Sequence, residues 1–247
     1  MNYLKMLPYQ VREAIENNYP IILPIGVVEY HAEHLPLGTD AFTAIDAVER
    51  LEKRHPELII LPPFYYGSAS FAVASPEGNG TVQVDSAKLI PVFEDIFRSL
   101  LRVGFRNIHG VIAHQTEGFA QGMPTDLAFR FAAKHAIFEF LEKEVGEGWW
   151  GTEQYSNYYS GGNDPFAWIK MHTLSMRNEL APLYPSDHAG KLETSEIMAI
   201  YPECVEMDRL DNSIWFARKG VEATAEYGHA AMEAAADALE IQLFGKK

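Results

Sequence analysis

The chain has 247 residues and a formal net charge of −14 at pH 7, from 20 basic and 34 acidic side chains. Because a surface this acidic repels phosphate backbones and anionic headgroups, we expect neither nucleic acid nor a membrane as a partner, whereas metal ions and a small-molecule substrate are compatible with it. No apolar stretch approaches the roughly 20 residues that span a bilayer, and residues 1–10 lack a signal-like pattern, so we expect a cytoplasmic protein.

Short apolar runs alternate with helical patterns along the whole chain. A run of β-branched residues bounded by proline or glycine predicts a buried strand, and apolar side chains three or four positions apart predict a helix. The predicted elements are a helix at 9–18, a strand at 21–28, a helix at 40–54, a strand at 58–61, a loop at 64–80, a helix at 86–103, a strand at 108–113, a helix at 123–145, a loop at 146–162, a strand at 169–174, and helices at 193–200 and 221–244.

This alternation predicts an α/β fold with a mainly parallel sheet and right-handed crossovers. Hydrophobic residues make up 47% of the chain, which is enough for a sizeable core. We find no linker, internal repeat or low-complexity tract, so a single domain over residues 1–247 is expected. Ligands of such sheets bind beyond the carboxyl ends of the strands, so chemistry is expected where polar residues follow a strand.

The first polar segment of this kind, residues 29–40, holds three acids and two histidines directly after a buried strand. In an extended segment the side chains of Glu29 and His31 point the same way, because strand side chains alternate with a period of two. Imidazole nitrogen and carboxylate oxygen suit Zn²⁺, Mn²⁺ or Fe²⁺. Asp40 could bridge two such ions in a site that activates water.

Each of these residues also has a plainer interpretation. Asp40 precedes a helix and could simply cap it. Glu33 is more typical of solvated surface, and His34 is as consistent with a hydrogen-bonded loop histidine as with a metal ligand. The plainer interpretation is weakest for Glu29 and His31, because charged and polar groups at the end of an apolar strand are costly unless they are used.

Two later segments carry further candidates. The strand at 108–113 leads into His114 and Glu117, and His114 could supply a ligand that the first segment lacks; His109, inside the strand, is more typical of a core or edge histidine. His188 is a candidate acid or base, because the ordinary imidazole pKa of about 6.5 suits proton transfer at neutral pH.

The helix that follows His188 has an interpretation without chemistry. Thr194 and Ser195 suit a helix start, where the helix dipole would favour the carboxylate of Glu193. The only cysteine, Cys204, cannot form an internal disulfide and has no strong base beside it in the sequence, so we expect it to be a bystander.

Together these segments resemble the creatininase (creatinine amidohydrolase) family. Residues 26–40 match the pattern Gly-x-x-Glu-x-His-x-x-His-Leu-Pro-x-x-Thr-Asp at every fixed position, and residues 188–195 match His-Ala-Gly-x-x-Glu-Thr-Ser. The resemblance covers roughly residues 20–200. It implies a three-layer α/β/α domain, assembly as a homohexamer, and two divalent metal ions per subunit (Zn, Mn or Fe) that activate water.

By position, the resemblance implies that Glu29 and His114 hold one metal, that His31 holds the other, and that Asp40 bridges them. His188 matches the catalytic histidine that passes a proton to the leaving nitrogen. The carboxylate of the remaining ligand is either Glu117, next to the position where creatininase itself has a glutamate, or Glu193, whose own block is intact. We favour Glu193, and count it among the catalytic residues with His188.

The resemblance also bears on the substrate. Creatininase closes its pocket with tryptophans, one of them four residues before the catalytic histidine, where this chain has Tyr184. Trp149, Trp150 and Trp168 could line a lid, although contacts within the core or between subunits explain them as well. We assign Tyr184, Trp150 and Trp168 to substrate binding. These departures from the family pattern weaken the case for creatinine as the substrate more than they weaken the case for a hydrolase.

Three functions follow. The leading one is metal-dependent hydrolysis of a C–N bond in a small cyclic amide or formamide. A second keeps the metal site but opens a carbocyclic, inositol-derived diketone by C–C cleavage. A third is a non-catalytic metal-binding assembly protein, which the single cysteine and several carboxylates disfavour because structural zinc sites prefer cysteine-rich shells.

Overall fold

The computed structural model describes residues 1–70, 72–73, 78–114, 123–174 and 182–245. The helices are α1 (Pro8–Glu16), α2 (Thr39–Arg54), α3 (Ile90–Val103), α4 (Thr125–Glu144), α5 (Lys191–Ile200) and α6 (Ala225–Phe244), and the strands are β1 (Ile21–Ile25), β2 (Ile59–Ile60), β3 (Ile108–Ile112) and β4 (Ile169–Thr173). Short 3₁₀ helices are η1 (Tyr3–Lys5), η2 (Ser86–Leu89), η4 (Trp149–Gly151), η5 (Tyr158–Ser160), η6 (Pro165–Ala167), η7 (Pro202–Cys204), η8 (Met207–Arg209) and η9 (Arg218–Glu222).

The four strands form one parallel sheet in the order β2-β1-β3-β4. Ile21 of β1 pairs with Ile59 on one side and with Ile108 on the other. The chain therefore moves from β1 outward to β2 and then crosses back past β1 to β3. This reversal makes the carboxyl ends of β1 and β3 the place where a doubly wound sheet opens a crevice.

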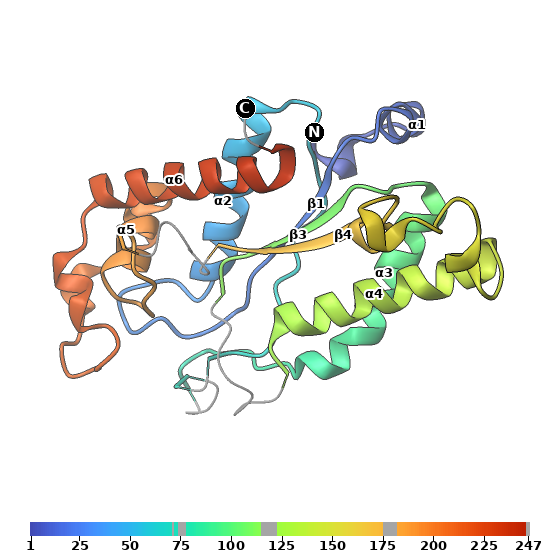
Figure 1. Ribbon diagram of the computed structural model, residues 1–247. Coiled ribbons are helices and arrows are strands. Elements are labelled where there is room, and N and C mark those ends of the chain that lie inside the picture. Colours follow the sequence, from blue (N-terminus) through green and yellow to red (C-terminus); the bar gives the residue numbers. More distant parts are fainter. Residues whose placement is uncertain (71, 74–77, 115–122, 175–181, 246–247) are drawn as a thin grey trace.

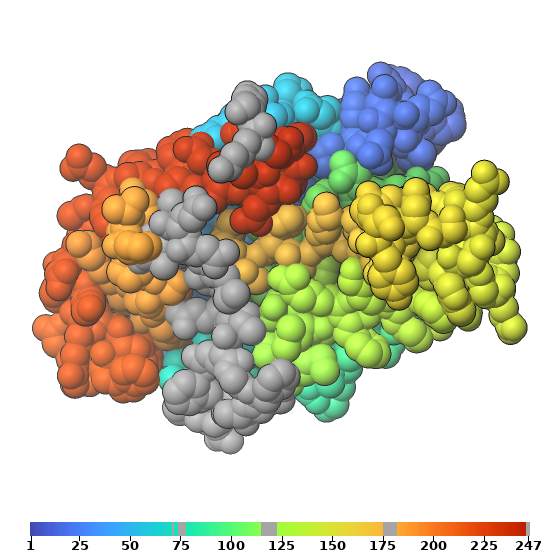
Figure 2. All heavy atoms as spheres, in the orientation of Figure 1, coloured from blue at the N-terminus to red at the C-terminus, as the bar shows by residue number. Residues whose placement is uncertain are grey.

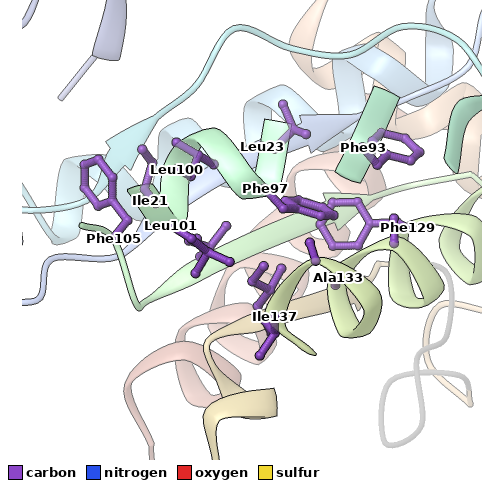
Figure 3. Close-up of a cluster of buried hydrophobic side chains, with 14 of the residues drawn as sticks. Ile21, Leu23, Phe93, Phe97, Leu100, Leu101, Phe105, Phe129, Ala133 and Ile137 are labelled. Atoms are coloured by element: carbon purple, nitrogen blue, oxygen red, sulfur yellow. The ribbon is translucent and has the colours of Figure 1, made fainter. Parts of the chain in front are cut away.

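Helices cover both faces of the sheet, as Figure 1 shows, so the predicted three-layer α/β/α architecture is confirmed. On one face, α3 and α4 pack against the sheet through phenylalanines; the ring centroids of Phe97 and Phe129 are 4.7 Å apart (Figure 3). On the other face, α2 and α6 bury a second, alanine-rich cluster. Every residue of β1 and β3 is buried, as expected for strands covered on both sides.

The predicted strand at 21–28 ends earlier, at Ile25, because the chain leaves the sheet at Gly26 to pass the first turn of α2. A Cβ atom on Gly26 would lie only 2.3 Å from the Cα of Ala41, so only glycine allows this approach. The close contact brings the segment after β1 beside the start of α2. Glu29 and Asp40 therefore become neighbours.

Two helix starts also differ from the prediction. Helix α5 begins at Lys191 rather than 193, because the Asp187 carboxylate accepts hydrogen bonds from the backbone N–H of Leu192 (2.8 Å) and of Glu193 (3.3 Å). The interpretation of Thr194 and Ser195 as the helix start is therefore wrong. Helix α6 begins at Ala225, where the hydroxyl of Thr224 accepts from the N–H of Tyr227 at 3.1 Å.

The aromatic stretch from 146 to 168 lies at the amino end of β4. The backbone carbonyl of Trp168 accepts from the N–H of Ile108, the first residue of β3. Trp149 is buried, and its ring lies 5.3 Å from the ring of Tyr155 and 5.9 Å from that of Phe166. These rings extend the core beyond the sheet. No helix among the described residues is long and apolar enough to cross a membrane.

Candidate metal centre

Six titratable side chains from four segments meet beyond the carboxyl ends of β1 and β3. Glu29 and His31 lie on the segment after β1, Asp40 lies in the first turn of α2, His114 follows β3 after one residue, and His188 and Glu193 come from the start of α5. All are buried except His188, whose side chain is 10% exposed. This is the crevice that the strand order predicts.

The carboxylate of Asp40 faces two histidines with different oxygens. Its Oδ1 lies 3.4 Å from Nε2 of His31, and its Oδ2 lies 3.1 Å from Nδ1 of His114. Gly38 occupies the N-cap position of α2, and no side chain forms a cap hydrogen bond there, so the interpretation of Asp40 as the cap is wrong. A carboxylate shared in this way is positioned to contact two cations at once.

The three histidines share one arrangement. The outer ring nitrogen of each donates to a backbone carbonyl: Nδ1 of His31 to Glu29 (3.0 Å), Nε2 of His114 to Ser68 (2.8 Å) and Nε2 of His188 to Tyr30 (2.9 Å). Because a carbonyl only accepts, the outer nitrogen carries a hydrogen, which leaves the inner nitrogen to hold either a proton or a metal ion. Each inner nitrogen faces the carboxylates.

The two glutamates are held by backbone donors. Oε2 of Glu29 accepts from the N–H of Ser70 at 2.8 Å, and Oε1 lies 3.2 Å from Nδ1 of His114. Oε2 of Glu193 accepts from the N–H of Ala189 at 2.7 Å and lies 3.4 Å from Nε2 of His31. These bonds fix the carboxylates before any ligand arrives.

Backbone strain accompanies two of the histidines. Ala32 follows His31 with φ of 59°, and Ala189 follows His188 with φ of 51°. The left-handed region disfavours residues with a Cβ atom. Both alanines are buried in one small cluster with Ile197, whose packing holds the strained backbone in place.

Without a cation, the buried charges compensate one another. Burial by itself raises the pKa of a carboxyl group and lowers that of an imidazole, but the attraction between them wins here. It places the pKa of Asp40 far below its usual range, lowers that of Glu29, raises that of His31 to about 10, and raises that of His114 well above 6.5. Burial dominates at Glu193 and raises its pKa. Protons therefore occupy the positions that cations would take.

The residues fit divalent metal ions. Glu29, Asp40 and His114 each offer a ligand atom within 4.8 Å of one another, and so do His31, Asp40 and Glu193. Within the described part of the chain, the buried Nε2 of His31 has no hydrogen-bond partner. A buried imidazole nitrogen that faces carboxylates is costly unless it holds a proton or a cation. Asp40 belongs to both ligand sets.

His188 lies at the edge of this cluster. Its Nδ1 is 3.7 Å from Oε1 of Glu29, and its ring centroid is 4.4 Å from that of His31. Burial and the charge of His31 lower its pKa to about 4, so it is neutral at pH 7. The ring of Phe216 contacts it edge-on at 4.9 Å and covers one of its sides. His188 also forms a third possible ligand set with Glu29 and His31.

Several predicted residues lie elsewhere. Glu33 is exposed, as expected, and its carboxylate accepts from the hydroxyl of Tyr30. His34 bonds Thr194 through Nε2 at 3.0 Å and so ties the first motif to the last. His109 is a core histidine, as expected, with Nδ1 2.9 Å from Nε2 of His172. Cys204, in η7, has no role in the cluster.

Two of the three aromatic residues assigned to substrate binding, Trp150 and Trp168, lie away from the cluster. Trp150 and Trp168 lie at the amino end of the sheet, whereas the cluster lies at the carboxyl end; a five-residue strand separates the two ends by roughly 16 Å. Trp150 is 55% exposed and contacts Phe138 of α4. Tyr184 packs against Tyr227 of α6, at a ring distance of 5.2 Å. Glu117 lies outside the described residues.

No sequence motif indicates the groups that hold the cluster from outside. Ser68 and Ser70 contribute backbone groups to His114 and Glu29, and Ser68 is anchored through its N–H to the hydroxyls of Ser86 (2.9 Å) and Thr125 (3.1 Å). Phe216 lies 28 residues after His188 in an irregular stretch without a motif. Only the small-residue composition of 67–70 could have indicated a segment that packs this closely.

Comparison with known proteins agrees with this geometry. The sequence model of the creatininase family, described as creatinine amidohydrolase, matches residues 5–242. The creatinine amidohydrolase of Pseudomonas putida is 28% identical over 200 residues, covering 77% of this chain and 67% of that protein.

Solved structures share the fold. A creatininase described with Mn has a TM-score of 0.72 at 19% identity, with 98% of both chains covered. A creatininase variant described as the Zn–Zn type has a TM-score of 0.70 at 20% identity, again over 98% of each chain. Since the family model spans nearly all of the sequence, the chain belongs to the creatininase family and is a hydrolase of that family.

Proposed function

We propose that this hydrolase uses metal-activated water to open a small cyclic amide or to cleave a related amide or formamide C–N bond. One observation carries the proposal: the inner nitrogens of three imidazoles and the oxygens of three carboxylates face a common centre, and Asp40 presents one oxygen to His31 and the other to His114. Such a donor set is of little use to the fold alone, because burying it costs desolvation energy.

In this proposal two divalent ions (Zn, Mn or Fe) occupy the cluster. Glu29, Asp40 and His114 hold one, and His31, Asp40 and Glu193 hold the other, so Glu193 is preferred to Glu117. The ions supply Lewis acidity, which polarises a carbonyl group and lowers the pKa of water. Imidazole and carboxylate ligands accept several metals, and the relatives described with Mn and with Zn agree with that range.

The outer groups keep these ligands in their working form. The carbonyls of Ser68 and Glu29 fix the tautomers of His114 and His31, and the N–H of Ser70 orients Glu29. Partners of this kind are worth about 10–100-fold in metal affinity.

His188 is the proposed proton carrier. Its Nε2–H is engaged by the carbonyl of Tyr30, which leaves Nδ1 free to hold a proton on the side that faces Glu29 and His31. Because His188 is neutral at pH 7, it would take this proton from the attacking water and deliver it to the nitrogen that leaves the carbonyl carbon. Phe216 shields the ring from water on one side, which keeps the proton on its path.

The proposed substrate class rests on the relative named creatinine amidohydrolase, since creatinine is a cyclic amide. The test is a panel of cyclic amides, formamides and cyclic polyol diketones, incubated in ¹⁸O-water with protein of known metal content. We expect one ¹⁸O in a new carboxylate and a newly freed N–H, and loss of both products in His188→Gln. Cys204→Ser is the matched control and should react like the parent chain.

Two other outcomes would replace the proposal. A new carboxylate with a new C–H bond would identify the C–C hydrolase of cyclic diketones. Turnover of no substrate, with His188→Gln indistinguishable from the parent chain, would favour a non-catalytic metal-binding protein.

We also propose a single domain over 1–247, assembly as a homohexamer and a cytoplasmic location. The homohexamer rests on the family resemblance, and light scattering of the purified protein tests it.

A further inference from the structure

A pocket lies on the outer edge of the sheet, apart from the metal centre. Within the described sheet, β4 pairs only with β3, and Figure 2 shows β4 at the surface between α6 and α4. Residues of β4, α4 and the segment 164–167 line an open pocket of about 430 Å³. None of the six side chains of the metal centre lines it.

The rim of this pocket is cationic, although the chain as a whole carries −14. Arg130 and Lys134 come from α4, and Lys170 comes from β4. Nε of Arg130 lies 3.6 Å from a carboxylate oxygen of Asp126, and Nζ of Lys134 donates to the carbonyl of Phe166. Among the described residues, neither lysine forms an ion pair, so the three cations outnumber the two nearby acids, Asp126 and Asp164.

The floor of the pocket is apolar. Phe129 and Met171 are buried, and the half-buried ring of Phe166 lies 5.2 Å from Nζ of Lys134. Asp164 is the one acid among the lining residues. A ligand that fits must therefore bring negative charge to the rim and apolar surface to the floor.

We propose that this pocket binds a small organic carboxylate, with the carboxylate between Arg130 and Lys170 and the apolar part against Phe166 and Met171. A guanidinium pairs well with a planar carboxylate. An anion would also offset the positive charge that Asp126 and Asp164 leave unbalanced among the three cations. A single negative charge suits this chain better than a dianion, because the net charge of the protein opposes anions at long range.

A second copy of the chain is a poorer occupant. Pairing of two β4 edges about a twofold axis would place the cationic rim of one copy against that of the other. Like charges that face each other across a sheet edge are destabilising. The charges of the pocket thus favour an anion over self-association.

Calorimetric titration of the metal-loaded protein with benzoate tests the proposal, with benzamide as the neutral analogue. We expect saturable binding of benzoate, and binding of benzamide at least about tenfold weaker, since the loss of one good charged hydrogen bond is worth that much. Equal affinity for the two compounds, or no saturation by benzoate, would overturn it.

Variants locate the binding. Arg130→Gln and Lys170→Gln should each weaken benzoate binding at least about tenfold, whereas Lys170→Arg should keep it. Lys143→Gln removes the same charge from an exposed position of α4 and is the matched control. Because carboxylates also bind metal ions, Asp40→Asn serves as a second control. Loss of benzoate binding in Asp40→Asn, with retention in Lys170→Gln, would assign the binding to the metal centre and end the proposal.

Discussion

The two ends of the same sheet are built from opposite chemistry. The carboxyl end holds buried charged groups, whose carboxylates are balanced only by protons or cations; they belong to Glu29, His31, Asp40 and His114. At the amino end, Trp149 and its aromatic neighbours continue the apolar core. The same strands connect the two ends, so the difference lies in the residues that precede and follow each strand.

This contrast indicates that one end of the sheet contributes stability and the other end contributes the candidate metal site. The aromatic end gains free energy from burial, roughly 1.5–3 kcal/mol for each large side chain. At the polar end, holding the ligands in place costs desolvation free energy, and the strained alanines beside two histidines add to that cost. We therefore expect changes at the carboxyl end to abolish metal binding and activity, and changes at the amino end to affect folding alone.

Asp40→Asn should have the largest effect. It removes the charge that both ligand sets share while keeping the size of the side chain. We expect metal affinity to fall by about 100-fold or more, beyond the range typical of outer-shell changes. Elemental analysis after dialysis measures the metal content, and the substrate panel measures the activity. Two ions retained per chain would contradict a bridging role.

His188→Gln should come next. We expect kcat to fall by roughly 10²–10⁴-fold, the usual contribution of a positioned acid or base. The metal content should remain that of the parent chain, because neither of the two sets that share Asp40 includes His188. If the metal is lost together with the activity, His188 acts as a ligand in the third set and the assignment of the proton carrier is wrong.

Ser70→Ala should have an intermediate effect. It removes the hydroxyl, whose Oγ lies 3.3 Å from Oε1 of Glu29, but keeps the N–H that holds Oε2. We expect roughly tenfold weaker metal binding, at the low end for an outer-shell partner. Ser160→Ala, at an exposed position of η5 near the amino end, is the matched control and should leave metal affinity unchanged.

The pH dependence of stability should distinguish metal-free from metal-loaded protein. In the metal-free chain the pKa of His31 is raised from 6.5 to about 10. The folded state therefore holds a proton that the unfolded state has released, so this stabilisation is complete below pH 6.5 and is lost as the pH rises through about 10. We expect the Tm of the metal-free protein to fall across this window. A parallel fall in the loaded protein would show that another group titrates.

Trp149→Ala should have the smallest effect on catalysis. It deletes a buried ring at the amino end and should cost about 3–5 kcal/mol in the free energy of unfolding. The kcat of the molecules that remain folded should equal that of the parent chain. Denaturant titration measures the first quantity, and metal-saturated kinetics below the Tm measure the second. A reduced kcat would show that the two ends are coupled.

The fold was largely predictable because its signals are local. Apolar runs bounded by proline and glycine marked β1 and β3, and apolar spacing marked α2 and α3, so the α/β class followed from short stretches of sequence. Boundaries were less predictable where distant groups decide them. Asp187 caps α5 from outside the helix, and Gly26 ends β1 because Ala41 lies against it.

The sequence by itself determined which residue types follow which strands, and with them Glu29, His31, Asp40, His114 and His188 as candidates, because these motifs are contiguous. Only the tertiary structure decided how they meet. The strand order places β1 beside β3, which joins residues 74 positions apart at Asp40 and His114. It also brings Glu193 to His31 and leaves Trp168 at the opposite end of the sheet. Spacing in the sequence determines which way side chains point within one helix or strand. The distances between helices and strands follow from how they pack, which no single segment encodes.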